Sequence, residues 1–385
     1  MPEVELVTDV ERLGALVPDW DALASACALP QMSPAWVLAW WRHVAPHGAV
    51  PRTVVVRDGD LLVGLAPFYS TPSAGGRVDY RLPGIELAGR LAPLAQRDRE
   101  WEVAEAVAHA LAHATPRPDA LRFEATPLEG HWLAALRDGW PTAVRPPLRL
   151  TQVDGNPLMS LREGSFAAWL AARSGNFRGQ MRRLRRRFEA AGGVSRLATH
   201  ATLANDAAAL ARLHALRWDG RVGSNLVELG DRFAAFVVQL GEQLLDDGRF
   251  ALRILELDGA AICAQLFVGA GGTFLFVNGG WDERYAALRP SLVCLLDTVE
   301  DMFDRGAQRF DLGVGVQSYK LRFADGNAQL AWGVLMMPSA RLPLTAARTA
   351  PALARTRLRD SARRMLPAQR VEQLRAAQRR LRSGS

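Results

Sequence analysis

Lys320 is the only lysine in a chain whose forty-six other basic side chains are all arginine. A lysine ammonium can lose its proton when it is desolvated, whereas the arginine guanidinium stays charged. Because arginine would serve as well for solubility or a surface ion pair, the single lysine favours a chemical role. The alternative is that a bias against lysine removed nearly all of them and one survived by chance.

The neighbours of Lys320 could assist such chemistry. Lys320 follows Tyr319 and comes shortly after a glycine-bearing turn that begins at Asp311. A buried lysine here could stabilise an oxyanion or a leaving group, or carry a proton. Tyr319 could pass on a proton, although a packed ring is an equal explanation. Asp311 could orient Lys320 or accept the proton of a nucleophile; the alternative is a salt bridge with Arg309 or Arg322.

The elements that must position these residues form a pattern that occurs twice. Residues 53–68 and 252–267 each read as two β-prone runs joined by Asp-Gly. Asp-Gly between such runs is a strong hairpin signal, because the turn needs positive φ. One such hairpin is commonplace, but two hairpins that are followed by similar elements indicate a duplication.

A helix and a strand are predicted after each hairpin. They cover 101–113 and 120–125 in the first half, and 291–304 and 308–312 in the second, where Ser291 is the predicted N-cap. A β-α-β crossover of this kind places its second strand beside the earlier sheet. Each half is therefore predicted to be a mixed α/β unit on a mostly antiparallel sheet.

Helices are also predicted ahead of the hairpins, at 33–43, 165–191 and 206–219. Residues 141–157, between the two halves, are rich in proline and turn formers, which suggests a junction near residue 155. We therefore predict three parts: an N-terminal domain over 1–155, a C-terminal domain over 156–340 and a basic helical tail over 341–385.

The net charge of +7 lies in this tail. From Arg348 onward there are eleven arginines and two acidic residues, whereas the rest of the chain has 36 basic and 38 acidic residues. The stretch 346–382 reads as a helix with a sparse apolar stripe, interrupted by prolines. It could bind an anionic membrane surface or a polyphosphate. The alternative is a terminal helix that packs on the body.

Composition argues against other classes of protein. The three cysteines are scattered and odd in number, which fits a reducing compartment and no disulfide framework. The start of the chain lacks the pattern of a signal peptide, and no run of about 18 apolar residues occurs. His109 and His113 have metal-ligand spacing but no third partner, so we expect no metal site. We expect a cytoplasmic protein, with possible attachment to the inner membrane face.

The order of elements resembles the GNAT acyltransferase fold in tandem. The duplicated form resembles the Fem-type aminoacyl transferases and, more closely, the CelD-like acyltransferases of polysaccharide biosynthesis. The resemblance rests on Asn176-Phe177-Arg178, Leu213-His214, Trp218, the Asp258-Gly259 hairpin, Tyr285 to Pro290, and Phe310-Asp311-Leu312-Gly313 leading to Tyr319-Lys320. The first half matches as a weaker copy.

The resemblance implies transfer of an acyl group from a thioester, such as acetyl-CoA, to an amine or hydroxyl of a sugar, peptide or lipid-linked precursor. GNAT enzymes have a glycine-rich loop before the helix that receives the coenzyme A pyrophosphate, but residues 282–291 contain no glycine. The helix start with Arg289 and Ser291, aided by Arg284, could still bind phosphate. Acyl-CoA, acyl carrier protein and aminoacyl-tRNA all stay open as donors.

The resemblance also suggests roles for other residues. The strand around 274–279 would offer backbone amides to the acyl carbonyl, and Asn278, Gly279 and Gly280 would let a ligand approach closely. Similarity to Fem-type enzymes favours electrostatic stabilisation by Lys320. Arg178, on an arginine-rich helix, and Trp218 are further candidates for substrate binding, although a solvated face and a core aromatic are the simpler explanations.

Two other functions remain open. A catalytically inactive copy of the fold could serve as a scaffold in a membrane-associated polysaccharide assembly, docked through the basic tail. A transferase that uses aminoacyl-tRNA is the other alternative, and it predicts tRNA binding that depends steeply on salt.

Overall fold

The computed structural model describes residues 2–71, 76–218 and 226–365. We call the part up to α5 the N-terminal half and the part from α6 to β13 the C-terminal half; β7 lies between them. In the N-terminal half and β7, the elements are β1 (Glu3–Val7), α1 (Val10–Gly14), α2 (Val17–Ala26), α3 (Pro34–His43), β2 (Val50–Asp58), β3 (Leu61–Ser70), β4 (Asp79–Arg81), β5 (Leu94–Ala95), α4 (Glu100–Ala112), β6 (Ala120–Pro127), α5 (Trp132–Asp138) and β7 (Leu148–Ser160).

The C-terminal half has the same alternation of elements. They are α6 (Phe166–Ala172), α7 (Gly175–Ala190), β8 (Val194–Leu197), α8 (Leu203–Trp218), α9 (Leu226–Leu229), α10 (Asp231–Leu244), β9 (Phe250–Leu257), β10 (Ala260–Ala270), β11 (Thr273–Trp281), α11 (Pro290–Asp304), β12 (Arg309–Asp311), α12 (Ser318–Phe323) and β13 (Gly326–Met336), followed by α13 (Leu342–Met365). Short 3₁₀ turns lie at Pro30–Met32 and Glu283–Leu288.

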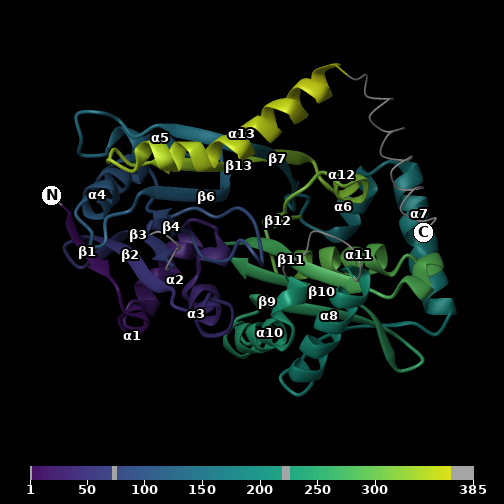
Figure 1. Ribbon diagram of the computed structural model, residues 1–385. Coiled ribbons are helices and arrows are strands. Elements are labelled where there is room, and N and C mark those ends of the chain that lie inside the picture. The colour runs from purple at the N-terminus through teal and green to yellow at the C-terminus, as the bar shows by residue number, and fades with distance from the viewer. Residues whose placement is uncertain (1, 72–75, 219–225, 366–385) are drawn as a thin grey trace.

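The strands of both halves join one mixed sheet. Its order is β1-β2-β3-β4-β6-β13-β7-β12-β11-β10-β9-β8, and β5 pairs with β3 off this path. The last strand, β13, pairs antiparallel with β6 of the N-terminal half and with β7, and β7 pairs with β12. Figure 1 shows the two halves side by side, with α13 lying across β13 and β7.

The predicted hairpins and crossovers are confirmed. β2 pairs with β3 and β9 with β10, and both Asp258 and Gly259 have positive φ in the second turn. In the first hairpin Asp58 pairs with Leu61, so the loop is Gly59-Asp60 instead of the predicted Asp58-Gly59. Each crossover helix connects parallel neighbours, α4 between β4 and β6 and α11 between β11 and β12.

Two helix predictions need correction. The single helix expected over 165–191 is two helices, because Arg173 is extended and the Ser174 hydroxyl caps α7 by accepting the N–H of Phe177. The predicted N-cap Ser291 lies inside α11, which begins at Pro290 after a left-handed residue. The predicted domain limit at residue 155 falls within β7, and the division into domains stays a prediction.

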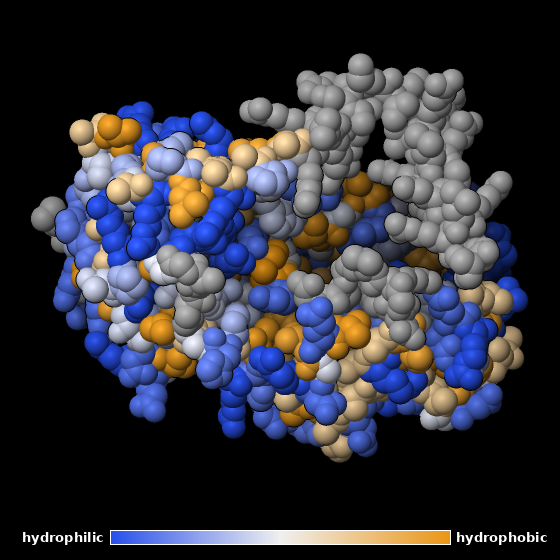
Figure 2. Space-filling model, viewed as in Figure 1, coloured by the Kyte–Doolittle hydropathy of each residue, from blue (hydrophilic) through white to orange (hydrophobic). Residues whose placement is uncertain are grey.

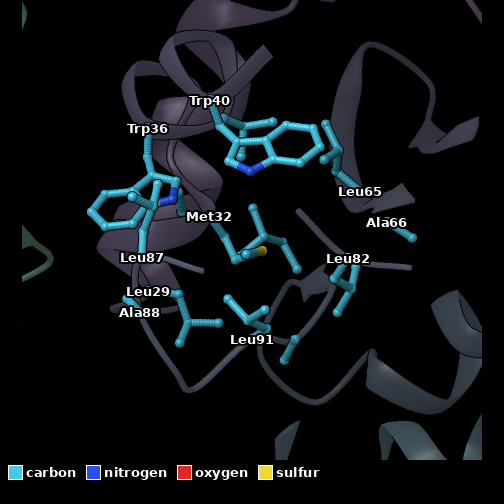
Figure 3. Packing of buried hydrophobic residues seen from close by; sticks show 14 of the residues in the cluster. Leu29, Met32, Trp36, Trp40, Leu65, Ala66, Leu82, Leu87, Ala88 and Leu91 are labelled. Carbon is cyan, nitrogen blue, oxygen red and sulfur yellow. The ribbon is translucent and has the colours of Figure 1, made fainter. Parts of the chain in front are cut away.

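The segment between β4 and β5 has little regular structure but is firmly packed. Leu82, Leu87 and Leu91 are buried in the same hydrophobic cluster as Trp36 and Trp40 of α3, and Leu87 lies beside Trp36 (Figure 3). This burial of large apolar side chains fixes the path of the segment. Two polar residues of the segment, Glu86 and Arg90, are thereby directed toward the C-terminal half.

The core continues from one half into the other. The rings of Trp36 and Phe236 of α10 meet edge to face at 5.1 Å. Arg249 of the C-terminal half forms a bidentate ion pair with Asp21 of α2, at 2.6 and 3.0 Å.

None of the described helices combines the length and apolar character needed to cross a membrane. Within the same described ranges, no three side chains gather into a metal-binding group.

Candidate active site

A cavity of about 390 Å³ opens where the two halves meet. The N-terminal half contributes Ile85 and Glu86 to its wall. The C-terminal half contributes His214, Arg217, Leu226, Phe276, Val277, Asn278, Gly279, Val314, Gln317, Tyr319 and Lys320. The face seen in Figure 2 is hollowed between the halves, and hydrophobic surface gathers there. Four residues predicted from the sequence, Lys320, Tyr319, Asn278 and Gly279, thus line one cavity.

Strand β11 separates from β12 at this cavity. Among the described residues the two strands pair in parallel only where Thr273–Leu275 faces Arg309–Asp311. On its other side β11 pairs with β10 up to Trp281, with a bulge beside Leu266. Bulges are common next to active sites, where they redirect a strand. The edge from Phe276 to Gly279 therefore faces the cavity and not a neighbouring strand.

Helix α8 lies close over the end of β11. A Cβ atom on Gly280 would lie 2.3 Å from the His214 nitrogen and from the Leu213 carbonyl carbon. The close neighbour that requires glycine at this position is therefore the backbone of α8. The N–H of Gly279 donates to Oδ1 of Asn278 at 2.6 Å, so this amide already has a partner.

Lys320 is a buried cation at the wall of the cavity, with 5% of its surface exposed. Its Nζ donates to the carbonyl oxygens of Val314 at 2.9 Å and Gly313 at 3.2 Å. Burial lowers the pKa of Lys320 to about 8, and the carboxylates of Asp311 and Asp154 oppose this fall. Near neutral pH the side chain is therefore largely charged but close to its titration midpoint.

Asp311 lies behind the turn that holds Lys320 and does not line the cavity. Its Oδ1 accepts the Asn156 amide at 3.0 Å and the Gly313 N–H at 2.8 Å. Its Oδ2 lies 3.9 Å from Nε of Arg90, so the ion-pair partner is Arg90 and not Arg309 or Arg322. Burial raises the pKa of this carboxyl group, and the Arg90 charge is the main opposing influence.

Tyr319 lines the same cavity beside Lys320. Burial raises the pKa of its hydroxyl group, an effect that the nearby Arg217 opposes. The hydroxyl therefore stays protonated at neutral pH, and a neutral phenol can donate a proton or a hydrogen bond.

His214 and Glu86 line the cavity, although the sequence analysis gives neither of them a role. His214 is buried; burial lowers the pKa of its imidazole, so the ring is neutral at physiological pH. Glu86 is the one carboxylate among the lining residues that the structure describes, and its Oε2 accepts the Trp40 indole N–H at 3.3 Å. The sequence near His214 carries the family resemblance, but nothing around Glu86 signals a site.

The predicted phosphate-binding residues lie apart from the cavity wall. Arg284 is exposed and forms an ion pair with Asp282 at 2.6 Å. Arg289 is exposed, has φ of 50° and immediately precedes α11. The carbonyl oxygen of Ser291 accepts the Gln265 side-chain amide at 3.0 Å. The start of α11 thus presents the exposed Arg289, although no glycine-rich loop precedes it. Pro290 has no N–H, and the N–H groups of Leu292 and Val293 both donate to the Arg289 carbonyl oxygen.

Of the two predicted substrate-binding residues, Arg178 is not brought into the cavity. Arg178 donates to the Ala171 carbonyl at 2.8 Å and so caps the end of α6. Trp218 is the last residue of α8, and its side chain lies outside the described residues. Its neighbour Arg217 does line the cavity, 5.9 Å from the ring of Trp281.

Comparisons with known proteins identify the fold. Residues 175–321 match the family described as "Acetyltransferase (GNAT) domain". FemX is similar in structure, with a TM-score of 0.57 and 10% identity, over 87% of this chain and 97% of FemX. L-PGS from Bacillus licheniformis has a TM-score of 0.51 and 12% identity, over 92% and 98% of the two chains. The sequence has no significant match among curated proteins.

The C-terminal half therefore matches a GNAT acetyltransferase domain over residues 175–321, as the sequence predicted, and the whole chain shares the fold of FemX. The matched region contains β11, β12 and Lys320 and so includes most of the cavity wall. The closer likeness predicted to CelD-like acyltransferases is not among these findings and stays a prediction.

Proposed function

We propose that the protein transfers an acyl group from a thioester, with acyl-CoA as the donor, to an amine or hydroxyl group of a sugar, peptide or lipid-linked precursor. The observation that carries this proposal is the placement of Lys320. The single lysine lies at the wall of a cavity beside the open edge of β11, within a GNAT domain. A buried ammonium at such an edge can stabilise the negative charge that acyl transfer develops.

The proposed reaction assigns roles to three polar residues of the cavity, Glu86, Lys320 and Tyr319. The acceptor nitrogen or oxygen attacks the thioester carbonyl carbon and gives its proton to Glu86, directly or through a water molecule. The Lys320 ammonium stabilises the oxyanion of the tetrahedral intermediate. The carbon–sulfur bond then breaks, and the Tyr319 hydroxyl protonates the leaving thiolate before it regains a proton from solvent.

The start of α11 supports acyl-CoA as the donor. The exposed Arg289 side chain, together with the positive end of the α11 dipole, could hold a pyrophosphate, because helix N-termini favour anions. Incubation of the full chain with a panel of acyl-CoA thioesters, followed by intact-mass and free-thiol measurements, tests the donor. Bound ligand or slow thioester hydrolysis with one member of the panel is the expected result.

Variants test the residues. Lys320→Ala and Glu86→Gln should each lower kcat by about 100-fold or more while the protein stays folded. Glu105→Gln, an exposed change on α4, serves as the control and should leave turnover unchanged. Full turnover of the true acceptor by Lys320→Ala would reject the assigned role.

Aminoacyl-tRNA as the donor is a second candidate, favoured by one feature of α7. Arg182, Arg183, Arg186 and Arg187 are exposed on this helix, whereas Arg185 is paired with Asp297 and Glu300. An exposed arginine surface suits a polyphosphate backbone. This candidate requires tRNA binding that weakens steeply between about 50 and 200 mM salt. Absence of tRNA binding at low salt would eliminate it.

A further inference from the structure

The segment of the N-terminal half that ends at Arg90 presses directly on the turn that holds Lys320. A Cβ atom on Gly89 would lie 2.2 Å from a Val314 methyl group, so the Val314 side chain packs directly against the Gly89 backbone. Val314 supplies one of the two carbonyl oxygens that accept hydrogen bonds from Lys320. The lysine therefore depends on a turn that is clamped from the other half of the molecule.

Arg90 is itself held in a special conformation. Its φ is 63°, in the left-handed region that residues with a side chain seldom adopt. Its carbonyl oxygen accepts the buried Gln31 side-chain amide at 2.6 Å. Its side chain is only 15% exposed and lies between Asp311 at 3.9 Å and Glu129 at 3.5 Å. A backbone strained in this way persists only where its surroundings fix it.

Asp311 connects Arg90 to the turn. One carboxylate oxygen accepts the N–H of Gly313, which fixes the start of the turn, and the other oxygen has no hydrogen bond and faces Arg90. A buried carboxylate that lacks a compensating charge tends to take up a proton. The only guanidinium within ion-pair distance of this carboxylate in the described chain belongs to Arg90.

We propose that Arg90 is a positioning residue for Lys320, which acts across the boundary between the halves by keeping Asp311 ionised. Ionised Asp311 fixes the turn at Gly313 and supplies the negative charge behind the ammonium group. The significance of Arg90 for catalysis rests on the proposed function. The coupling of Arg90 to Lys320 through Asp311 does not depend on that function.

The charged and titratable groups around Lys320 and Asp311 decide in which direction the pKa of Lys320 changes when Arg90 is removed. Those near Lys320 or Asp311 are Asp154 of β7, Glu86 and Glu129 of the N-terminal half, His214 and Arg217 of α8, and Tyr319 of α12. Arg90 influences Lys320 through Asp311. If Arg90 is removed, Asp311 takes up a proton more readily, and Lys320 loses the neighbour that most favours its charged form.

The single lysine allows a direct test. The full chain labelled with [ε-13C]lysine gives one lysine Cε resonance, because Lys320 is the only lysine. Its chemical shift can be titrated from pH 5 to 11 without any substrate. In Arg90→Met we expect the midpoint of the Lys320 titration to fall by roughly one pH unit. Asp311→Asn should lower the midpoint similarly, and the double variant should add little to either change.

Arg249→Met is the matched control, because it breaks another ion pair between the halves that does not involve Asp311. Its midpoint should equal that of the wild type. An unchanged midpoint in folded Arg90→Met, or in Arg90→Gln should the methionine variant not fold, would overturn the proposal. A lowered midpoint in a protein without acyl transfer would reject the proposed function alone, so the two failures can be distinguished.

Discussion

At the scale of single residues, Lys320 combines a proposed functional role with a cost in stability. Its ammonium is buried and is hydrogen-bonded only to carbonyl oxygens within the described chain, and burial lowers its pKa from 10.5 to about 8. This lowering of the pKa means that the folded protein disfavours the charged form of Lys320, relative to the neutral form, by roughly 3 kcal/mol. The fold thus maintains a charged group in a place where a neutral one would be more stable.

The first prediction concerns stability. Because the unfolded chain binds the Lys320 proton up to about pH 10.5 and the folded chain only up to about pH 8, the contribution of this group to stability rises between these pH values. Lys320→Met should therefore be more stable than the wild type at pH 7, by up to about 3 kcal/mol. The difference should vanish near pH 10. Urea unfolding at both pH values measures this, and a variant that is less stable at pH 7 would contradict it.

The second prediction concerns activity. If Lys320 stabilises an oxyanion, only its protonated form is active, so kcat should fall about tenfold for each pH unit above the titration midpoint near 8. A rate profile from pH 6 to 10 measures this, with protein that is shown to stay folded throughout. A rate that rises through pH 8 would indicate that Lys320 acts as a proton acceptor instead.

The residues of the site differ in how far the sequence could reveal them. Lys320 stands out because composition isolates it, and Tyr319 and Asp311 are its close neighbours in the chain. Glu86 and Arg90 cannot be found this way, because their positions depend on packing against Trp36 and Trp40 and on contacts far along the chain. The role of Asp311 in orienting Lys320 stays a prediction, and its ion-pair partner Arg90 lies in the other half.

At the scale of elements, the contact between α8 and β11 shapes the cavity. Gly280 permits the backbone of α8 to lie against the end of the open strand. His214 and Arg217 of α8 line the cavity, so they depend on this approach.

The third prediction tests this contact. Gly280→Ala should destabilise the protein by about 3 kcal/mol, because the new methyl group would meet backbone atoms that cannot move aside. Gly14→Ala is the control: no atom lies within 4 Å of its added Cβ, and it should be neutral or slightly stabilising. Thermal unfolding of both variants measures the difference, and equal melting temperatures would contradict the prediction.

Helix and strand predictions succeeded where local signals decide the structure and failed where two signals compete. The Asp-Gly hairpins and both crossovers follow from local patterns. The break between α6 and α7 was missed, because alanines and arginines continue a helical pattern across Arg173. Ser174 signals a new N-cap there, but serine also occurs inside helices.

At the scale of the whole molecule, the two halves share one sheet and one core. β13 pairs with β6 and β7, and Trp36 meets Phe236 across the boundary. The repeated hairpins predicted two similar units, but they carry no information on which half the last strand would join. Such a pairing is non-local and leaves no periodic signal in the sequence.

The fourth prediction follows from this shared sheet. Thermal unfolding of the full chain should give one transition with equal calorimetric and van't Hoff enthalpies, because neither half keeps its sheet without the other. Arg249→Met should lower the midpoint while it leaves a single transition, since it weakens one contact between the halves. Two resolved transitions would show that the halves are independent.

The place of β13 in the chain also has a consequence for synthesis in the cell. Its pairing partner β6 leaves the ribosome about two hundred residues before β13 does. Throughout that interval the nascent N-terminal half exposes an unpaired strand edge, which is a risk for aggregation. The sheet is therefore complete only after β13 has been synthesised, and a nascent chain stalled before β13 is expected to need a chaperone.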